Sequence, residues 1–300
     1  MKAFLLAAGY GERLRPLTDT IPKPLVPVMN VPSICYALTL LKESGITEIV
    51  CNIHYLHAQI EEFFQKHDNF GLNVIFSYEP RILGTGGGLM NCRGHFQEGP
   101  FVYINTDIVA DIDLKAVIES CASSRPGGSL VIGRSAAGGR VTVKGDRIVN
   151  LRAILPVNET PEYDFLGAAL LTPDIFTHLK KGFSDIVETG FIGLMKKGSL
   201  GFYEQAGPWH DIGSLESYRE ANIALLDMNE TFRNRIHEMV GLKPSAVAGS
   251  ARIGGGAVVV RSVIGDNCRV GDGSFVEESV LLTGAALAAG EAAIRMVKWI

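Results

Sequence analysis

The apolar positions in the first two thirds of the chain switch repeatedly between strand-like and helix-like periods. Short apolar runs predict strands at the start of the chain and at 47–53, 72–79, 100–107 and 129–135. Apolar residues at helical spacing predict helices at 31–46, 57–67 and 113–123. Pro32 suits the first turn of the first helix, and Gly45 suits its C-terminal cap. Strands that alternate with helices indicate an α/β fold with a Rossmann-like, mixed, mostly parallel sheet sandwiched by helices.

The C-terminal part of the chain has a different, six-residue period. Its apolar positions are Val247, Ile253 and Val259, and then, after a slip of one residue, Ile264, Val270, Val276 and Leu282. This spacing predicts a left-handed parallel β-helix, in which each hexapeptide forms one side of a triangular coil. The repeat is short, so we interpret it as an assembly element rather than a second enzyme. We expect its open ends to be capped by the last residues or buried in a homo-oligomer.

The length of 300 residues suggests roughly two domains. We therefore assign residues 1–228 to the α/β domain, residues 229–243 to a linker helix, and residues 244–300 to the repeat with its terminal cap. Hydrophobic residues make up 47% of the chain, which is normal for a globular protein with a sizeable core.

After the first strand, the sequence becomes rich in glycine and positively charged. Gly9 and Gly11 are followed by Arg13, and Lys23 comes later in the same loop. Ligands of α/β sheets bind beyond the carboxyl ends of the strands, where this flexible, cationic loop is suited to hold phosphate. A dinucleotide fingerprint does not fit, because leucine occupies the third glycine position. The second glycine cluster, 84–88, lacks the lysine of a P-loop.

The loop closely resembles the signature of the sugar-1-phosphate nucleotidylyltransferases. In that family a strand precedes Gly-x-Gly-x-Arg-Leu-x-Pro-Leu-Thr and a later Lys-Pro. Every one of these positions is filled in this chain, by Gly9, Gly11, Arg13, Leu14, Pro16, Leu17, Thr18, Lys23 and Pro24. The resemblance implies a GT-A-like catalytic domain that transfers a nucleoside monophosphate from an NTP to a sugar 1-phosphate. It assigns catalytic roles to Arg13 and Lys23, although both could instead be ordinary surface cations.

Two aspartates resemble the magnesium ligands of the family. Asp107 ends the predicted strand 100–107, and Asp211 belongs to the later motif 209–213. The resemblance therefore implies Mg²⁺ as the cofactor. Each aspartate has an alternative role as a helix cap, although Asp111 and Asp113 are better placed than Asp107 to cap the helix that follows.

The resemblance also assigns residues to the nucleotide. The strand end, the loop and the block 79–87 are expected to contact the nucleotide through Leu6, Ala8, Gly9, Gly11, Glu79, Gly84, Thr85 and Gly86. The glycines of the block could instead form only a tight strand-to-helix turn. The block favours GTP or UTP as the donor, and dTTP remains open.

The sugar-phosphate part of the family pattern is incomplete in this chain. The family's Glu-Lys-Pro segment is missing, and Arg152, between its strand neighbours, is the candidate to replace the lysine. The resemblance implies that Gly167 leaves room for the sugar ring. Glu188 and Thr189 could hydrogen-bond to sugar hydroxyls.

Other functional classes receive little support from the sequence. The net charge of −4 and the lack of a basic stripe argue against nucleic acid as a partner. No run of 18 apolar residues predicts a membrane span, and we expect a cytoplasmic protein. The 5 cysteines include no Cys-x-x-Cys pair. A zinc site at Cys51, His54 and His57 is disfavoured, because a strand followed by a helix would point these side chains in different directions.

A rival hypothesis is a non-catalytic regulatory subunit of the same fold that binds a nucleotide sugar without turnover. Such relatives generally lose the arginine, the lysine or a metal-binding aspartate. This chain keeps Arg13, Lys23, Asp107 and Asp211, which favours the enzyme.

Overall fold

The computed structural model describes residues 1–121, 127–135 and 138–300. The chain forms two compact units. The first, which we call the sheet unit, contains residues 1–10 and 40–209, and the second, the signature unit, contains residues 11–39 and 210–300. The signature loop therefore belongs to the same unit as the C-terminal repeat. The predicted domain boundary at residue 228 does not coincide with the boundaries of these units. The division into a catalytic domain, a linker helix and a repeat stays a prediction.

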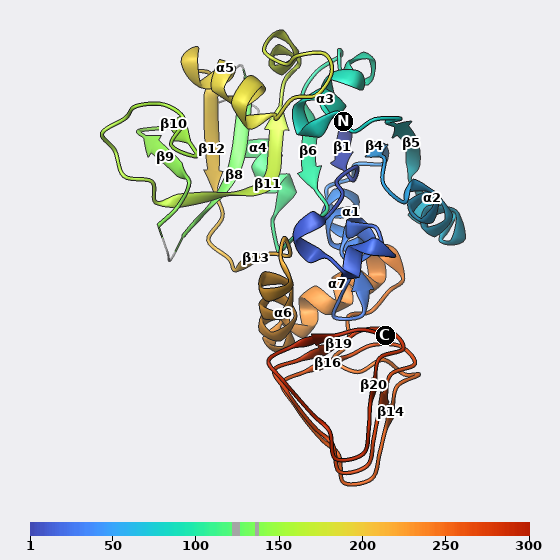
Figure 1. Ribbon diagram of the computed structural model, residues 1–300. Coiled ribbons are helices and arrows are strands. Elements are labelled where there is room, and N and C mark those ends of the chain that lie inside the picture. The colour runs from blue at the N-terminus through green and yellow to red at the C-terminus, as the bar shows by residue number, and fades with distance from the viewer. Residues whose placement is uncertain (122–126, 136–137) are drawn as a thin grey trace. The chain divides into compact units, whose positions relative to one another are not determined.

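The sheet unit is built on a nine-stranded sheet in the described part of the chain. Its strands are β1 Lys2–Leu6, β4 Glu48–Ile53, β5 Asn73–Tyr78, β6 Phe101–Asn105, β8 Gly128–Arg134, β9 Val141–Lys144, β10 Arg147–Leu151, β11 Tyr163–Leu171 and β12 Leu200–Glu204. Their order is β10-β9-β11-β6-β1-β4-β5, and β8 pairs with β11 and β12 (Figure 1). Strands β5, β4, β1 and β6 are parallel, whereas β11 is antiparallel to its neighbours. The predicted mixed α/β fold is confirmed.

Helices connect several of these strands. They are α1 Ile34–Glu43, α2 His57–Lys66, α3 Gly84–Asn91, α4 Leu114–Cys121 and the short α5 Ile192–Lys196. Three of them, α1, α2 and α4, lie where the apolar periods predict helices, whereas α3 and α5 were not predicted. The C-terminal cap of α1 is confirmed, because Gly45 has a φ of 73° and Ile46 N donates to Leu41 O. The position of Pro32 is wrong: it lies in the short strand β3 Val31–Pro32, which pairs with β2 Pro27–Val28.

The core of the sheet unit is rich in aromatic side chains. Phe4 on β1 stacks on Tyr103 of β6 with ring centroids 5.8 Å apart, and Phe96 packs against Phe101 at 4.4 Å. All four side chains are buried. Their packing fixes β1 beside β6, so that the segments that follow these two strands leave the same edge of the sheet.

In the signature unit, the tip of the β2–β3 hairpin is tied to the C-terminal half of the chain. Met29 N donates to Asn222 Oδ1 (2.8 Å) on α6 Leu215–Ala224. Asn30 Nδ2 donates to the carbonyl oxygens of Ser245 and Ile264, both at 3.0 Å. Helix α7 Glu230–Val240 covers most of the predicted linker helix. These buried or half-buried contacts hold the N-terminal loop and the C-terminal strands in one compact unit.

The C-terminal strands form three parallel, three-stranded sheets in the described residues, which we call the C-terminal strand stack. The strands are β14 Arg252–Ile253, β15 Val258–Val260, β16 Val263–Ile264, β17 Arg269–Val270, β18 Phe275–Glu277, β19 Val280–Leu281, β20 Ala286–Leu287, β21 Ala292–Ile294 and β22 Val297–Lys298. They stack in layers of triangular outline (Figure 1).

Residues of the stack that lie above one another are 17 positions apart, as in the hydrogen bond from Ser279 N to Ser262 Oγ. A period of 17 contains two six-residue sides and one five-residue side, which explains the one-residue slip in the sequence. Val270, Val276 and Leu281 are buried in the core of the stack. The predicted position Leu282 is wrong by one residue, because Leu281 is the register partner of Ile264. The parallel strand groups agree with the predicted repeat, whereas the hand of the coil stays a prediction.

Within the described ranges, no helix has the length and apolar character that crossing a membrane requires.

Candidate functional site

Several candidate nucleotide contacts lie at the carboxyl edge of the parallel strands in the sheet unit. Leu6 at the end of β1 is in register with Asn52 of β4 and with Asn105 of β6. Ala7 N donates to Asn52 Oδ1 (3.0 Å), and Thr106 Oγ1 donates to Leu6 O (3.0 Å). These bonds fix the backbone that leads to Ala8 and Gly9 and the backbone that leads to Asp107.

Glu79, a candidate nucleotide contact, is only 1% exposed. Its Oε1 accepts a hydrogen bond from Asn52 Nδ2 and its Oε2 accepts one from Leu83 N, both at 2.8 Å. The carboxylate therefore links β4 to the start of α3. This internal role was not predicted, and a direct contact of Glu79 with nucleotide stays a prediction.

The glycine block opens helix α3 instead of forming a separate turn before it. Gly84 has a φ of 71°, and a Cβ there would lie 2.6 Å from Ser184 O. Gly86 N donates to the same carbonyl (2.8 Å), and Ile186 N donates to Thr85 Oγ1 (2.8 Å). The block is therefore the packing surface for the segment around Ser184, a distant contact that local sequence cannot reveal.

The sugar-phosphate candidates gather around Asp185, a residue that the sequence analysis missed. Arg152 Nη1 lies 3.3 Å from Asp185 Oδ2. Asp185 Oδ1 accepts from Glu188 N (3.2 Å), and Asp185 O accepts from Thr189 Oγ1 (2.6 Å). Arg152 does not lie within a strand, because β10 ends at Leu151 and Arg152 has a φ of 54°. Apart from its position near Glu188, nothing in the sequence marks Asp185.

Three charged residues in this part of the sheet unit change the pKa of the buried Tyr103. Burial raises the pKa of its phenol, the carboxylates of Asp107 and Asp185 raise the pKa further, and Arg152 lowers it. Asp107 and the Arg152–Asp185 pair therefore act electrostatically on the same buried group. Asp107 itself is half-buried.

Gly167 lies in an irregular stretch of β11, where the pairing with β8 shifts between Phe165 and Ala169. Its φ is 66°, and a Cβ would lie 2.9 Å from Ile108 Cγ1 and 3.0 Å from Asn105 Cβ. Glycine is therefore required by the backbone and by these neighbours. The expected space for a sugar ring stays a prediction.

In the signature unit, Gly11 shapes the loop that carries both candidate catalytic cations. Its φ of 68° begins the single turn Glu12–Leu14, which carries Arg13. A Cβ on Gly11 would lie 2.9 Å from Thr18 Cγ2 and 3.2 Å from Lys23 Cβ. The glycine therefore lets the backbone of the two cationic segments approach closely.

Arg13 and Asp211 converge on Gly213 within the same unit. A Cβ on Gly213 would lie 2.7 Å from Arg13 Nη2 and 2.5 Å from Asp211 Oδ1. Gly213 N also donates to Asp211 Oδ1. The N-cap of α6 is Ser214, not Asp211, because Ser217 N donates to Ser214 Oγ (3.2 Å). Asp211 is thus positioned beside a cation of the signature loop.

The alternative role of Asp107 was to cap the helix that follows it, α4. Ala116 N donates to Asp113 Oδ1 (2.9 Å) at the start of α4. Asp113 therefore supplies this cap, as the sequence predicts.

The side chains that the structure describes contain no group of three or more His, Cys, Asp and Glu residues that could hold a metal ion by themselves. His54 bonds to Tyr10 Oη (2.9 Å), and His57 bonds to Glu61 Oε2 (2.9 Å), while Cys51 is buried on β4. Their separate partners explain why the spacing of these residues does not bring them together.

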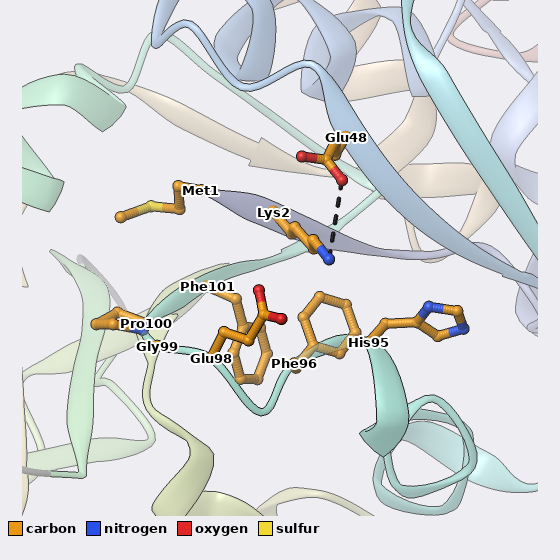
Figure 2. Close-up of a pocket in the computed structure, with 9 residues that line it drawn as sticks. All are labelled: Met1, Lys2, Glu48, His95, Phe96, Glu98, Gly99, Pro100 and Phe101. Carbon is orange, nitrogen blue, oxygen red and sulfur yellow. Dashed lines mark ion pairs between the residues drawn. The ribbon is translucent and has the colours of Figure 1, made fainter.

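One cavity of the sheet unit lies away from the candidate site (Figure 2). Lys2 and Phe101, which line it, begin strands β1 and β6 at the amino edge of the sheet. Lys2 Nζ lies 3.8 Å from Glu48 Oε2 across the cavity wall. No predicted site residue lines this cavity, so it does not belong to the transfer site.

Comparisons with known proteins agree with the sequence motifs. The family model described as Nucleotidyl transferase matches residues 2–137. The chain is 34% identical to N-acetylmuramate alpha-1-phosphate uridylyltransferase of Neisseria meningitidis serogroup B, over 74% of this chain and 96% of that protein. It is 28% identical to mannose-1-phosphate guanylyltransferase of Mycobacterium tuberculosis, over 96% of this chain and 81% of that protein.

The fold is also similar to that of a solved structure. A Bacillus anthracis protein assigned as a glucose-1-phosphate thymidylyltransferase, crystallised with sucrose, superposes with a TM-score of 0.67. The superposition covers 77% of this chain and 98% of that chain at 24% sequence identity. At this identity, the likeness concerns the fold alone.

Proposed function

Because the chain belongs to the nucleotidyl transferase family of sugar-1-phosphate nucleotidylyltransferases, we propose that it transfers a nucleoside monophosphate from an NTP to a sugar 1-phosphate. Pyrophosphate is the second product. The observation that carries this proposal is the convergence of Arg13 and Asp211 beside Gly213. It brings together a cation of the signature loop and a candidate metal ligand from a distant part of the chain.

The nucleophile in this reaction is a phosphate oxygen of the sugar 1-phosphate. Its second pKa is about 6, so the oxygen is largely ionised at neutral pH and needs no general base. The barrier arises instead from the approach of two anions and from the charge on the departing pyrophosphate. Positioning and preorganised positive charge are therefore the main catalytic requirements.

We assign the preorganised positive charge of the chain to Arg13 and Lys23. Arg13 presents a planar guanidinium, which can donate two hydrogen bonds to one phosphate group. Lys23 supplies a more compact charge from a loop whose close approach to Arg13's segment depends on Gly11. In this proposal both cations bind the triphosphate and stabilise the negative charge that develops as pyrophosphate leaves.

We also propose that Asp107 and Asp211 are the protein ligands of a magnesium ion. Asp107 and Asp211 are half-buried carboxylates, and Mg²⁺ prefers one or two such oxygen ligands together with water and phosphate oxygens. When bound, the ion would neutralise phosphate charge. The carboxylates of Asp107 and Asp211 would hold the magnesium ion beside the triphosphate.

The nucleotide is expected at the carboxyl edge of β1 and at the start of α3. The backbone of Leu6, Ala8 and Gly9 would read the base, and Gly84 to Gly86 would pack against the base and ribose. UTP and GTP are the proposed donors. The relatives named above are a uridylyltransferase and a guanylyltransferase, and the higher identity, 34%, is with the uridylyltransferase.

For the sugar phosphate, we propose Arg152 in place of the family's missing lysine. Asp185 holds the guanidinium on one side, which leaves the remaining donors of the fork for phosphate. Glu188 and Thr189 follow Asp185 closely and would bind sugar hydroxyls, next to the space expected at Gly167.

We propose that the C-terminal strand stack is a left-handed β-helix that assembles the protein into a homo-oligomer. The outer face of β15, β18 and β21 supports this role. Val258 and Ile294 on this face are 48% and 51% exposed, and Phe275 is half-buried. Burial of such apolar side chains between subunits would remove them from water.

A pyrophosphate-release assay tests the proposed function. Four NTPs are combined with a panel of hexose, amino-sugar and heptose 1-phosphates, with and without Mg²⁺. The proposal predicts Mg²⁺-dependent release with UTP or GTP and at least one sugar 1-phosphate. Binding of a nucleotide sugar without release in any combination would instead support the regulatory subunit.

A further inference from the structure

The C-terminal strand stack carries two arginines that have no role in the proposed transfer reaction. Arg252 on β14 and Arg269 on β17 are register partners on neighbouring parallel strands. Their side chains therefore leave the same face of the sheet, from neighbouring strands that lie about 4.8 Å apart. Both residues are exposed, and the next position of this ladder is Ala286. Two positive charges thus stand side by side at the surface of the stack.

Such a pair is unfavourable unless an anion neutralises it, because like charges on directly opposite residues destabilise a sheet. Other exposed arginines of the stack have carboxylate partners. Arg261 and Arg295 each form an ion pair at 2.8 Å. In the part of the chain that the structure describes, Arg252 and Arg269 have no such partner.

The aspartates in the adjoining turns are engaged in other hydrogen bonds. Asp266 Oδ1 accepts from Ser250 Oγ, and Asp272 Oδ1 accepts from Gly255 N, both at 2.7 Å. These bonds hold the turns between strands. Asp266 is therefore engaged with a serine hydroxyl and Asp272 with a backbone N–H, rather than with the two guanidinium groups.

A cavity of about 400 Å³ opens beside the two arginines. It is lined by Gly249, Ser250, Ala251, Arg252, Asn267 and Arg269. The lining contains two cations and a side-chain amide but no acidic side chain. Its volume falls within the range of small-molecule sites, which is roughly 300–1,000 Å³.

We propose that this cavity binds a phosphate-bearing anion, with the guanidinium groups of Arg252 and Arg269 as its principal donors. A guanidinium matches the geometry of phosphate oxygens and can donate two parallel hydrogen bonds to them. Asn267 adds an amide donor at the wall of the cavity. Inorganic phosphate, pyrophosphate and a sugar phosphate share this chemistry, and each is a candidate ligand.

The test measures anion binding to the full-length chain carrying Arg13→Ala and Lys23→Ala, so that phosphate binding by these two cations is weakened. Calorimetric titrations without divalent ions use inorganic phosphate, pyrophosphate, a hexose 1-phosphate and sulfate as separate probes. We expect saturable binding at one site for at least one phosphate compound. The tightest of the three identifies the preferred source of the phosphate.

Adding Arg252→Gln and Arg269→Gln is expected to weaken this binding about tenfold or more. The matched control adds Arg261→Gln and Arg295→Gln, which removes the same charge from the same stack and should change affinity less than about twofold. Thermal unfolding provides a second readout. The phosphate compound should raise the Tm of the parent but not that of the Arg252→Gln, Arg269→Gln variant.

Several results would overturn the proposal. One is the lack of binding by the parent, and another is an equal loss of affinity in both pairs of variants, which would indicate only bulk charge. Equal affinity for sulfate would contradict recognition of phosphate. If Arg252→Gln and Arg269→Gln change the sedimenting mass but not the anion affinity, the arginines face another subunit instead. Circular dichroism checks that each variant is folded. The double variant Arg252→Lys, Arg269→Lys keeps the charge, so its anion affinity should lie between those of the parent and the Arg252→Gln, Arg269→Gln variant.

Discussion

The carboxyl edge of the sheet unit and the loop of the signature unit both carry motif residues, but their contacts differ. In the sheet unit, Glu79 accepts two internal hydrogen bonds and Gly86 donates its N–H to a neighbouring segment. In the signature unit, Arg13 and Asp211 approach the same space beside Gly213. Internal packing accounts for the contacts of Glu79 and Gly86, whereas Arg13 and Asp211 are opposite charges that lie near each other. A motif residue therefore indicates a ligand contact only after its internal contacts have been accounted for.

The largest effect is expected from removing the cations of the signature loop. Arg13→Ala and Lys23→Ala should each lower kcat about 100-fold or more, by analogy with the loss of one preorganised donor. Pyrophosphate release measures the effect. Arg15→Ala is the matched control, since Arg15 lies in the same loop but forms an exposed ion pair with Asp19 at 3.3 Å. Wild-type rates for both variants would assign Arg13 and Lys23 to the surface rather than to the reaction.

The second effect concerns the metal. Asp107→Asn and Asp211→Asn each remove a charge from the proposed donor set, so the Mg²⁺ concentration for half-maximal activity should rise about tenfold or more. Asp113→Asn is the control, because this side chain caps α4. If the Mg²⁺ titration of the two variants matches that of the wild type, these aspartates do not bind the ion.

Filling the space between the converging charges should have a smaller effect. Gly213→Ala places a methyl group where Arg13 Nη2 and Asp211 Oδ1 now lie within 2.7 Å and 2.5 Å. Displacement of either group should lower kcat about tenfold. Gly94→Ala, at a position with nothing within 4 Å of the added carbon, should leave kcat unchanged. An unchanged kcat for Gly213→Ala would separate the convergence from catalysis.

A still smaller effect is expected at the proposed sugar-phosphate position. Arg152→Gln should raise the KM for the sugar 1-phosphate about fivefold, while the KM for the NTP stays unchanged. Asp185→Asn should raise the same KM less, because Asp185 positions Arg152 and the backbone of Glu188 and is not itself a proposed phosphate ligand. Arg147→Gln is the control for a nearby arginine on β10. An equal rise for Arg147→Gln would contradict the assignment of Arg152.

The smallest effect on kcat, below about twofold, is expected from Glu79→Ala. This change leaves Asn52 Nδ2 and Leu83 N without their buried acceptor, so the free energy of unfolding should fall by about 3 kcal/mol. Urea unfolding measures this loss, and Glu98→Ala, at an exposed position, serves as the control. Unchanged stability together with a raised KM for the NTP would show that Glu79 is a ligand contact.

The strands β1, β4, β5, β6 and β8 and the helices α1, α2 and α4 could be predicted from the sequence because these elements have their own apolar periods. The errors arose where a distant segment decides the local structure. The glycines at 84–86 form the start of α3 because the segment around Ser184 packs against them. Arg152 leaves its strand for a turn, and its partner Asp185 carries no recognisable motif. The roles of the charged residues in the signature loop were assigned from the resemblance of the motif and stay predictions.

The most direct test of the central claim is a crystal structure of the protein with Mg²⁺ and a non-hydrolysable NTP analogue. The account predicts that Arg13 and Lys23 donate hydrogen bonds of about 3 Å to phosphate oxygens of the bound nucleotide. Carboxylate oxygens of Asp107 and Asp211 should lie about 2.1 Å from the metal ion. A triphosphate that contacts neither cation, or an ion bound by neither aspartate, would contradict the account.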